Sequence, residues 1–146
     1  EPGAHAGTFR GNQLAMKAGT IVLNRVSKPE FLADVTRKGD LIRAKLNELK
    51  NKVSIIGDIR GKGLMIGTEF INPKGSPDCI GSYPASGEIA GKVQKLCFEN
   101  GLIVEKGGRN GSVMRCLCAL NISDEDLNKA YDIFEKCVLK VNQEYK

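Results

Sequence analysis

Two short stretches rich in β-branched and apolar residues constrain the fold of this chain most strongly. They are residues 53–59 and 64–70, and a glycine-containing turn, Arg60-Gly61-Lys62-Gly63, joins them. Such a pair predicts two adjacent antiparallel strands. Two more strands are expected at 102–105 and 112–117, joined by a turn at residues 106–111. We therefore expect a sheet of short, mostly antiparallel strands.

Segments with helical spacing of apolar residues precede, separate and follow these strands. The last segment is the clearest, because Ser123 can cap a helix and three acidic residues follow in its first turn. Pro29 is typical of the first turn of a new helix. The other helices are expected at about 12–25, from 29 to about 49, and before the stop at Asn100-Gly101. At 146 residues, the sequence predicts one α+β domain, a small mostly antiparallel sheet with helices packed on one face.

Composition excludes several classes of partner. The net charge of +5 is small, and basic and acidic residues alternate along the predicted helices, as on solvated faces. Aromatic residues make up 5% of the chain and tryptophan is absent, which disfavours stacking on bases. No apolar run approaches the roughly 20 residues that span a bilayer, and no charged-then-apolar leader is present. We expect a cytoplasmic protein that binds neither nucleic acid nor membrane.

The cysteines do not predict a disulfide framework or a metal centre. There are five, an odd number, and Cys116 and Cys118 alternate on an apolar strand, so both side chains face the same side. A metal site would need two more ligands, and the single histidine, His5, is far away in the sequence. We expect buried, reduced thiols and no bound metal.

A glycine-rich run near the start is suited to binding an anion. Residues 7–12 read Gly-Thr-Phe-Arg-Gly-Asn and lead directly into the first predicted helix. A turn of this kind presents backbone N–H groups and a hydroxyl, which suit a phosphate. An ordinary helix cap at Asn12 explains the same residues, so the pattern alone leaves both interpretations open.

Arg115 is the strongest candidate for a ligand contact. It stands in the otherwise apolar strand at 113–118, where a guanidinium is costly unless it meets an anion. Its planar set of donors suits a carboxylate in a bidentate pair. An outward-facing arginine, or one paired with a local glutamate, is the alternative interpretation.

Three segments in this order resemble class III (fold-type I) pyridoxal-phosphate-dependent aminotransferases. Residues 8–12 resemble the family's Thr-Phe-x-Gly-Asn opening, and residues 60–69 resemble its Arg-Gly-x-Gly-Leu-Met-x-Gly-x-Glu hairpin. Residues 113–123 resemble its late arginine-containing strand, although Cys118-Ala119-Leu120 replaces the usual Pro-Pro-Leu. Together with His5, the first segment most resembles the diaminobutyrate–2-oxoglutarate branch. The resemblance covers nearly the whole chain.

The resemblance implies the C-terminal small domain of such an enzyme, with residues 1–26 as a loop and linking helix and residues 27–146 as the small domain. It implies that Arg115 holds the α-carboxylate of the amino-acid or 2-oxo-acid substrate. It further implies that Gly7, Thr8 and Phe9 contact the phosphate of pyridoxal 5'-phosphate bound to the neighbouring subunit of a homodimer. No catalytic residue is assigned within the chain.

Transamination also needs a lysine that forms a Schiff base with the cofactor, an acidic partner for its pyridine nitrogen and a large α/β sheet, none of which this sequence predicts. We therefore expect the C-terminal part of a longer enzyme, inactive without the large domain of the same protein. The expected reaction transfers the terminal amino group of L-2,4-diaminobutyrate to 2-oxoglutarate. The alternatives are an aminotransferase for ornithine, acetylornithine or 4-aminobutyrate, and a stand-alone interaction domain without catalytic activity.

Overall fold

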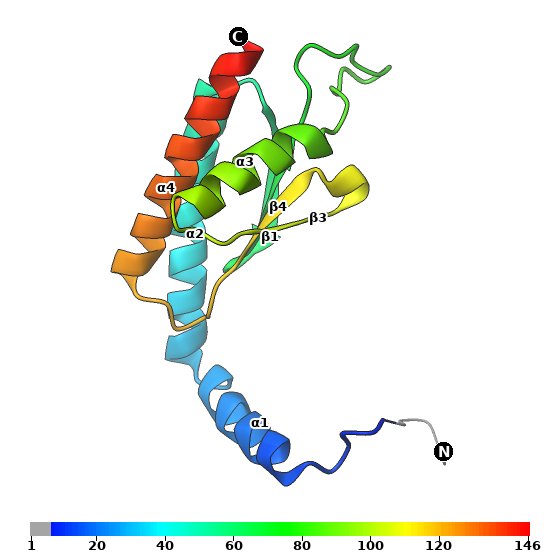
Figure 1. Cartoon of the computed structure of the whole chain (residues 1–146). Helices are drawn as coiled ribbons and strands as arrows, with labels where there is room; N and C mark the ends of the chain where they lie inside the picture. The colour runs from blue at the N-terminus through cyan, green and yellow to red at the C-terminus, as the bar shows by residue number, and fades with distance from the viewer. Residues whose placement is uncertain (1–6) are drawn as a thin grey trace. The chain divides into compact units, whose positions relative to one another are not determined.

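The computed structural model describes residues 7–146 (Figure 1). It comprises two compact units, one up to Asp34 and one from Val35 to Lys146. His5, which precedes the turn predicted to bind an anion, lies outside the described residues. No helix in the described part of the chain is both long enough and apolar enough to cross a bilayer.

The first unit contains the predicted linking helix. Helix α1 (Gln13–Val26) begins after Asn12, whose side chain accepts a hydrogen bond from the backbone N–H of Ala15 at 3.1 Å. Helix α2 (Pro29–Lys52) begins at Pro29, where a proline ring is compatible with the first turn because that N–H has no helical acceptor. Both helix starts agree with the sequence prediction.

Among residues 7–146, four strands pair into one antiparallel sheet: β1 (Ile56–Lys62), β2 (Met65–Phe70), β3 (Glu105–Gly107) and β4 (Val113–Leu117). Their order across the sheet is β1-β2-β4-β3. On β2, Ile66, Thr68 and Phe70 are buried, whereas Met65 is 63% exposed. Because alternate residues of a strand point to opposite faces, one face of the sheet is covered and the other is open.

The helices of the second unit cover the buried face. Phe134 of helix α4 (Asp124–Asn142) meets Phe70 of β2 edge to face, with ring centroids 6.5 Å apart. Helix α3 (Gly87–Glu99) contacts β2, β3 and β4 and is capped by Ser86, which accepts from the Ile89 N–H at 3.2 Å. Figure 1 shows α3 and α4 beside the sheet. The predicted α+β fold with helices on one face is confirmed.

Two strand boundaries differ from the sequence prediction. Strand β1 continues through Lys62, which pairs with Met65, so the turn is the two residues at 63–64 rather than Arg60-Gly61-Lys62-Gly63. Strand β3 lies at residues 105–107 instead of 102–105, because the antiparallel register places these residues opposite β4. In both cases cross-strand pairing, which local composition does not encode, decides where the strand ends.

Candidate substrate-binding site

Arg115 lies in the middle of β4, in a row of residues that crosses the sheet. Its cross-strand neighbours are Gly67 on β2 and Glu105 on β3, and Arg60 on β1 pairs with Gly67 in turn. Met114 precedes Arg115 and is buried, so it points to the helix-covered face. The alternation of the strand therefore directs Arg115 to the other face.

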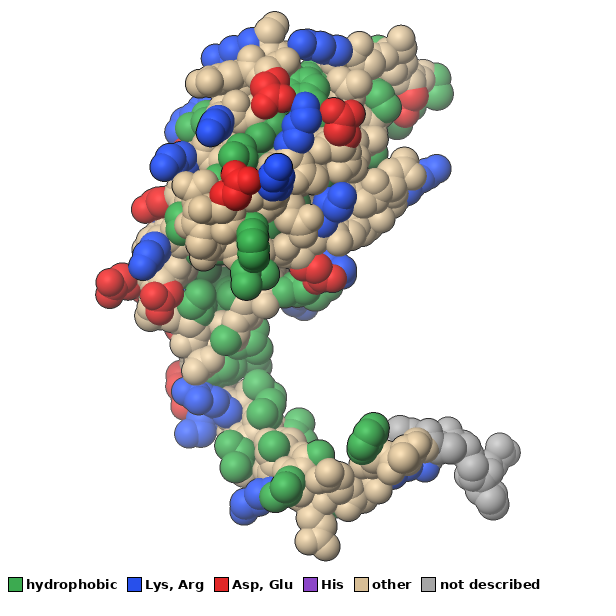
Figure 2. Space-filling model, viewed as in Figure 1, with side chains coloured by type: hydrophobic (Ala, Val, Ile, Leu, Met, Phe, Trp, Pro, Cys, Tyr) green, Lys and Arg blue, Asp and Glu red, His purple; other side chains and the backbone are tan. Residues whose placement is uncertain are grey.

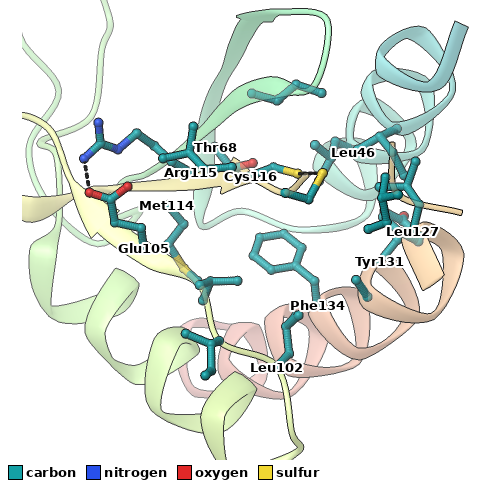
Figure 3. Close-up of a pocket in the computed structure, with 18 residues that line it drawn as sticks. Leu46, Thr68, Leu102, Glu105, Met114, Arg115, Cys116, Leu127, Tyr131 and Phe134 are labelled. Atoms are coloured by element: carbon teal, nitrogen blue, oxygen red, sulfur yellow. Dashed lines mark hydrogen bonds and ion pairs between the residues drawn. The ribbon is translucent and has the colours of Figure 1, made fainter. Parts of the chain in front are cut away.

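The guanidinium of Arg115 forms an ion pair with the carboxylate of Glu105, through Nη2 and Oε1. Figure 3 shows the two side chains turned toward each other at the sheet edge. The Arg115 side chain is 38% exposed and that of Glu105 is 48% exposed. The alternative suggested by the sequence, an arginine paired with a local glutamate, is therefore the state that this structure shows.

Arg115 nevertheless keeps an unused donor. Its Nε is buried and is the only buried side-chain nitrogen or oxygen, among the described residues, that has no hydrogen-bond partner. An unpaired buried N–H costs about 1–3 kcal/mol. A carboxylate ligand takes hydrogen bonds from two neighbouring N–H groups of a guanidinium at once. This site thus has donor capacity that Glu105 does not satisfy.

Gly107 makes room for the guanidinium. A Cβ atom built at position 107 would lie 2.9 Å from Nη2 of Arg115, closer than real side chains approach. The backbone of Gly107 does not have a positive φ, so its conformation does not require glycine. The close approach of Arg115 is the feature that favours glycine at this position. The sequence indicated only a turn at residues 106–111, and the role of Gly107 could have been found only from the register of β3 on β4.

Arg60, on the same face, is more fully satisfied. It forms ion pairs with Asp58 at 2.8 Å and with Glu69 at 2.5 Å. The hydrogen bond from Arg60 lowers the pKa of Asp58, and the two carboxylates raise the pKa of Arg60. Two carboxylates already neutralise this arginine, so Arg115 is the better candidate for binding an anionic ligand.

A cavity of about 340 Å³ lies on the helix-covered side of the sheet. Its lining is mainly aliphatic and aromatic, with Phe134 and Met114 at its centre in Figure 3. Glu105 and Arg115 are the only charged residues that border it, and their charged groups pair with each other on the opposite face of the sheet. The cavity is therefore unsuited to a dicarboxylate or a diamine.

The turn that the sequence proposed for phosphate binding is exposed. Gly7 accepts a hydrogen bond from the Arg10 N–H at 3.2 Å, and Phe9 accepts one from the Asn12 N–H at 3.3 Å. The Thr8 hydroxyl makes no hydrogen bond to another residue of the described part, and the Phe9 ring is 85% exposed. A free hydroxyl beside an open backbone turn fits the donor set that a phosphate needs.

The cysteines agree only partly with the prediction. All five are free, but only Cys97 and Cys137 are buried, while Cys116 and Cys118 are half-buried and Cys79 is exposed. Cys79 lies in the loop before α3, outside the core, so burial of all five was wrong. The described residues contain no group of three side chains that could hold a metal ion.

Residues 1–138 match the family model described as Aminotransferase class-III. The chain belongs to the class III aminotransferase family. It is 38% identical over 139 residues to the diaminobutyrate–2-oxoglutarate aminotransferase of Haemophilus influenzae, covering 95% of this chain and 31% of that protein. It is 44% identical over 129 residues to the enzyme of the same name from Rhizobium meliloti, covering 88% of this chain and 27% of that protein.

Solved structures of this family have the same fold. The ornithine aminotransferase of Toxoplasma gondii matches with a TM-score of 0.75 and 28% identity, covering 99% of this chain and 31% of that one. The acetylornithine aminotransferase of Elizabethkingia anophelis matches with a TM-score of 0.71 and 28% identity, covering 96% of this chain and 33% of that one. This class III aminotransferase chain thus spans about a third of the length of the relatives that it matches.

Proposed function

We propose that this chain is the C-terminal small domain of a pyridoxal-phosphate-dependent enzyme that transfers the terminal amino group of L-2,4-diaminobutyrate to 2-oxoglutarate. Residues 1–26 would form the loop and linking helix and residues 27–146 the small domain. The similarity to two diaminobutyrate–2-oxoglutarate aminotransferases supports the choice of substrates. The observation that most supports Arg115 as the substrate-binding residue is its Nε donor, which has no hydrogen-bond partner.

Arg115 binds the α-carboxylate of 2-oxoglutarate, which adjoins the carbon that receives the amino group, and that of the glutamate formed from it. Before substrate arrives, Glu105 pairs with the guanidinium, and both side chains are more than a third exposed. An ion pair at this exposure contributes about 0.2–1 kcal/mol. Glu105 pairs with the guanidinium through Nη2 alone, whereas a substrate carboxylate that also accepts from Nε forms a bidentate pair, so the substrate displaces Glu105 at little cost.

Thr8, with Gly7 and Phe9, contacts the phosphate of a cofactor held by the neighbouring subunit of a homodimer. The open turn and the free Thr8 hydroxyl support this role. When bound, pyridoxal phosphate supplies the electron sink for transamination. The lysine and the acidic group that this chemistry needs belong to the large domain of the same enzyme, which is the partner of this chain.

Substitution of Arg115 in the full-length enzyme tests the proposal. Arg115→Lys keeps the charge but loses the two-pronged geometry, so kcat/KM falls about 10-fold or more for 2-oxoglutarate. The loss is smaller for L-2,4-diaminobutyrate, in which two carbons separate the α-carboxylate from the carbon that bears the transferred amino group. Steady-state kinetics with each substrate varied in turn measure this. Arg60→Lys, on the same sheet face, is the matched control and leaves both values nearly unchanged. Unchanged kinetics in Arg115→Lys remove Arg115 from the site.

A second candidate is an enzyme for acetylornithine. The chain is 34% identical over 145 residues to the acetylornithine aminotransferase of Debaryomyces hansenii. A panel of L-2,4-diaminobutyrate, ornithine, acetylornithine and 4-aminobutyrate, each with 2-oxoglutarate, separates the two candidates. The highest kcat/KM is expected for L-2,4-diaminobutyrate, and a preference for acetylornithine would replace the first proposal.

A further inference from the structure

Cys116 and Cys118 form a close pair of thiols with only one residue between them. Their Sγ atoms are 3.9 Å apart and in hydrogen-bonding contact. Both line the apolar cavity on the helix-covered face, where Figure 3 labels Cys116. This pair includes the position at which the sequence departs from the family's usual Pro-Pro-Leu step.

The backbone on one side of the pair is free to adjust. Cys116 is paired with Ile66 in the sheet, but β4 ends at Leu117. Cys118 therefore lies outside the ladder of cross-strand hydrogen bonds. A disulfide requires the sulfur atoms to approach to about 2.05 Å, which a shift of the unpaired Cys118 backbone can accommodate without breaking a strand pair.

The surroundings favour a disulfide over a metal site. No third cysteine, histidine or carboxylate of the described residues joins the two thiols in a ligand group. Burial, and then the neighbouring Cys118 thiol, raise the pKa of Cys116 to about 11. The thiolate of Cys116 is therefore scarce near neutral pH, and its oxidation is slow but accelerates as the pH rises.

We propose that Cys116 and Cys118 are an oxidative modification site that a small-molecule disulfide converts into an intrachain disulfide. One cysteine thiolate attacks a sulfur of the reagent, whose S–S bond breaks and releases one thiolate. The second cysteine thiolate then attacks the mixed disulfide and releases the other half of the reagent. The two protons lost by the cysteines go to the two released thiolates, so both cysteines are oxidised and one reagent disulfide is reduced.

The oxidation state of Cys116 and Cys118 can be measured separately from that of the other cysteines. Trypsin cuts after Arg115 and Lys129, so both cysteines lie in the peptide of residues 116–129. The full chain is treated with bis(2-hydroxyethyl) disulfide, the remaining thiols are alkylated, and the peptides are analysed by mass spectrometry. The expected peptide has lost two hydrogens and carries neither an alkyl group nor a reagent adduct. Treatment with a reductant before alkylation restores two alkylation sites.

The chain supplies its own controls. Cys79 is exposed and has no described thiol neighbour, so it acquires a single reagent adduct and shows that the oxidant is active. Cys97 and Cys137 are buried and stay unmodified, which defines the conditions under which the chain is folded. In the Cys118→Ser variant, the peptide of residues 116–129 cannot form an internal disulfide, so its mass does not fall by two hydrogens.

Two outcomes overturn the proposal. One is a 116–129 peptide that carries two alkyl groups under conditions that fully modify Cys79. The other is a peptide in which Cys116 and Cys118 each carry a separate reagent adduct. The result does not depend on the substrate or on Arg115, so it stands or falls independently of the proposed function.

Discussion

At the scale of single residues, the direction of one guanidinium depends on three neighbours in the sheet. Glu105 attracts Arg115 from the adjacent strand, and Gly107 leaves the space over which the guanidinium lies. Gly67 places no side chain between Arg115 and Arg60. The Nε of Arg115 is left without a partner, and that donor makes this arginine, rather than Arg60, suited to a carboxylate.

Gly107→Ala in the full-length enzyme is expected to weaken substrate use without unfolding the protein. The added methyl group meets the mobile end of Arg115, so the guanidinium moves and the fold does not. We expect kcat/KM to fall about 10-fold for 2-oxoglutarate, with a change in unfolding free energy within about 1 kcal/mol. Kinetics and denaturant unfolding of the same sample measure both. Unaltered kinetics would show that Gly107 does not position Arg115.

At the scale of elements, close backbone approach and hydrogen bonds join α2 to its neighbours. A Cβ atom at Gly39 of α2 would overlap the backbone carbonyl of Gly63 in the β1–β2 turn. Tyr131 of α4 donates a hydrogen bond to the backbone carbonyl of Lys45 in α2 at 2.9 Å. These contacts hold α2 against both the hairpin and α4.

Gly39→Ala is expected to destabilise the second unit although alanine is the better helix former. The overlap is with backbone, which cannot swing away, and overpacking of this kind costs about 1–3 kcal/mol. Gly19→Ala is the matched control on α1, because no atom lies within 4 Å of its added Cβ, and helix propensity favours it by up to about 1 kcal/mol. Chemical denaturation of both variants compares them. Equal or greater stability of Gly39→Ala contradicts the close approach.

Tyr131→Phe tests the link between α4 and α2 and its pH dependence. Burial, followed by nearby carboxylates, raises the pKa of Tyr131 to about 12, above the value of about 10 in an unfolded chain. Stability from the protonated hydroxyl is therefore complete below about pH 10 and is lost as the pH rises toward 12. Tyr131→Phe should cost about 0.5–1.5 kcal/mol at pH 7 and flatten the alkaline loss.

Denaturant unfolding from neutral to alkaline pH measures this effect. Tyr83→Phe in the exposed loop before α3 is the control and should follow the wild-type curve. If the wild type and Tyr131→Phe lose stability in parallel at high pH, the hydroxyl of Tyr131 is not the titrating group.

At the scale of the whole molecule, the chain spans about a third of its relatives and includes a candidate carboxylate site. The proposed activity requires a second domain that carries the cofactor lysine. The 146-residue chain alone, supplied with pyridoxal phosphate and both substrates, is therefore expected to form no glutamate. A coupled glutamate assay measures this, with the full-length enzyme as the positive control. Sustained glutamate formation by the chain alone would refute the proposal that the activity requires a second domain.

Much of the secondary structure could be predicted because its signals are local. Asn12, Ser86 and Ser123 cap helices through hydrogen bonds to backbone groups three residues away. The strand ends were less predictable, since β3 depends on which residues face β4 across the sheet. Arg115 was identified from its apolar strand, but its pairing with Glu105 depends on a contact between strands.

The amino-acid sequence by itself determined the α+β class, the starts of α1, α2 and α4, and the family, because periodicity, capping and motif order are properties of neighbouring residues. Only the tertiary structure decided which groups surround Arg115, which cysteines are buried and how Gly39 meets Gly63. Strand register and helix docking set these contacts. They arise from the free energy of the whole chain, in which residues far apart in sequence contribute together.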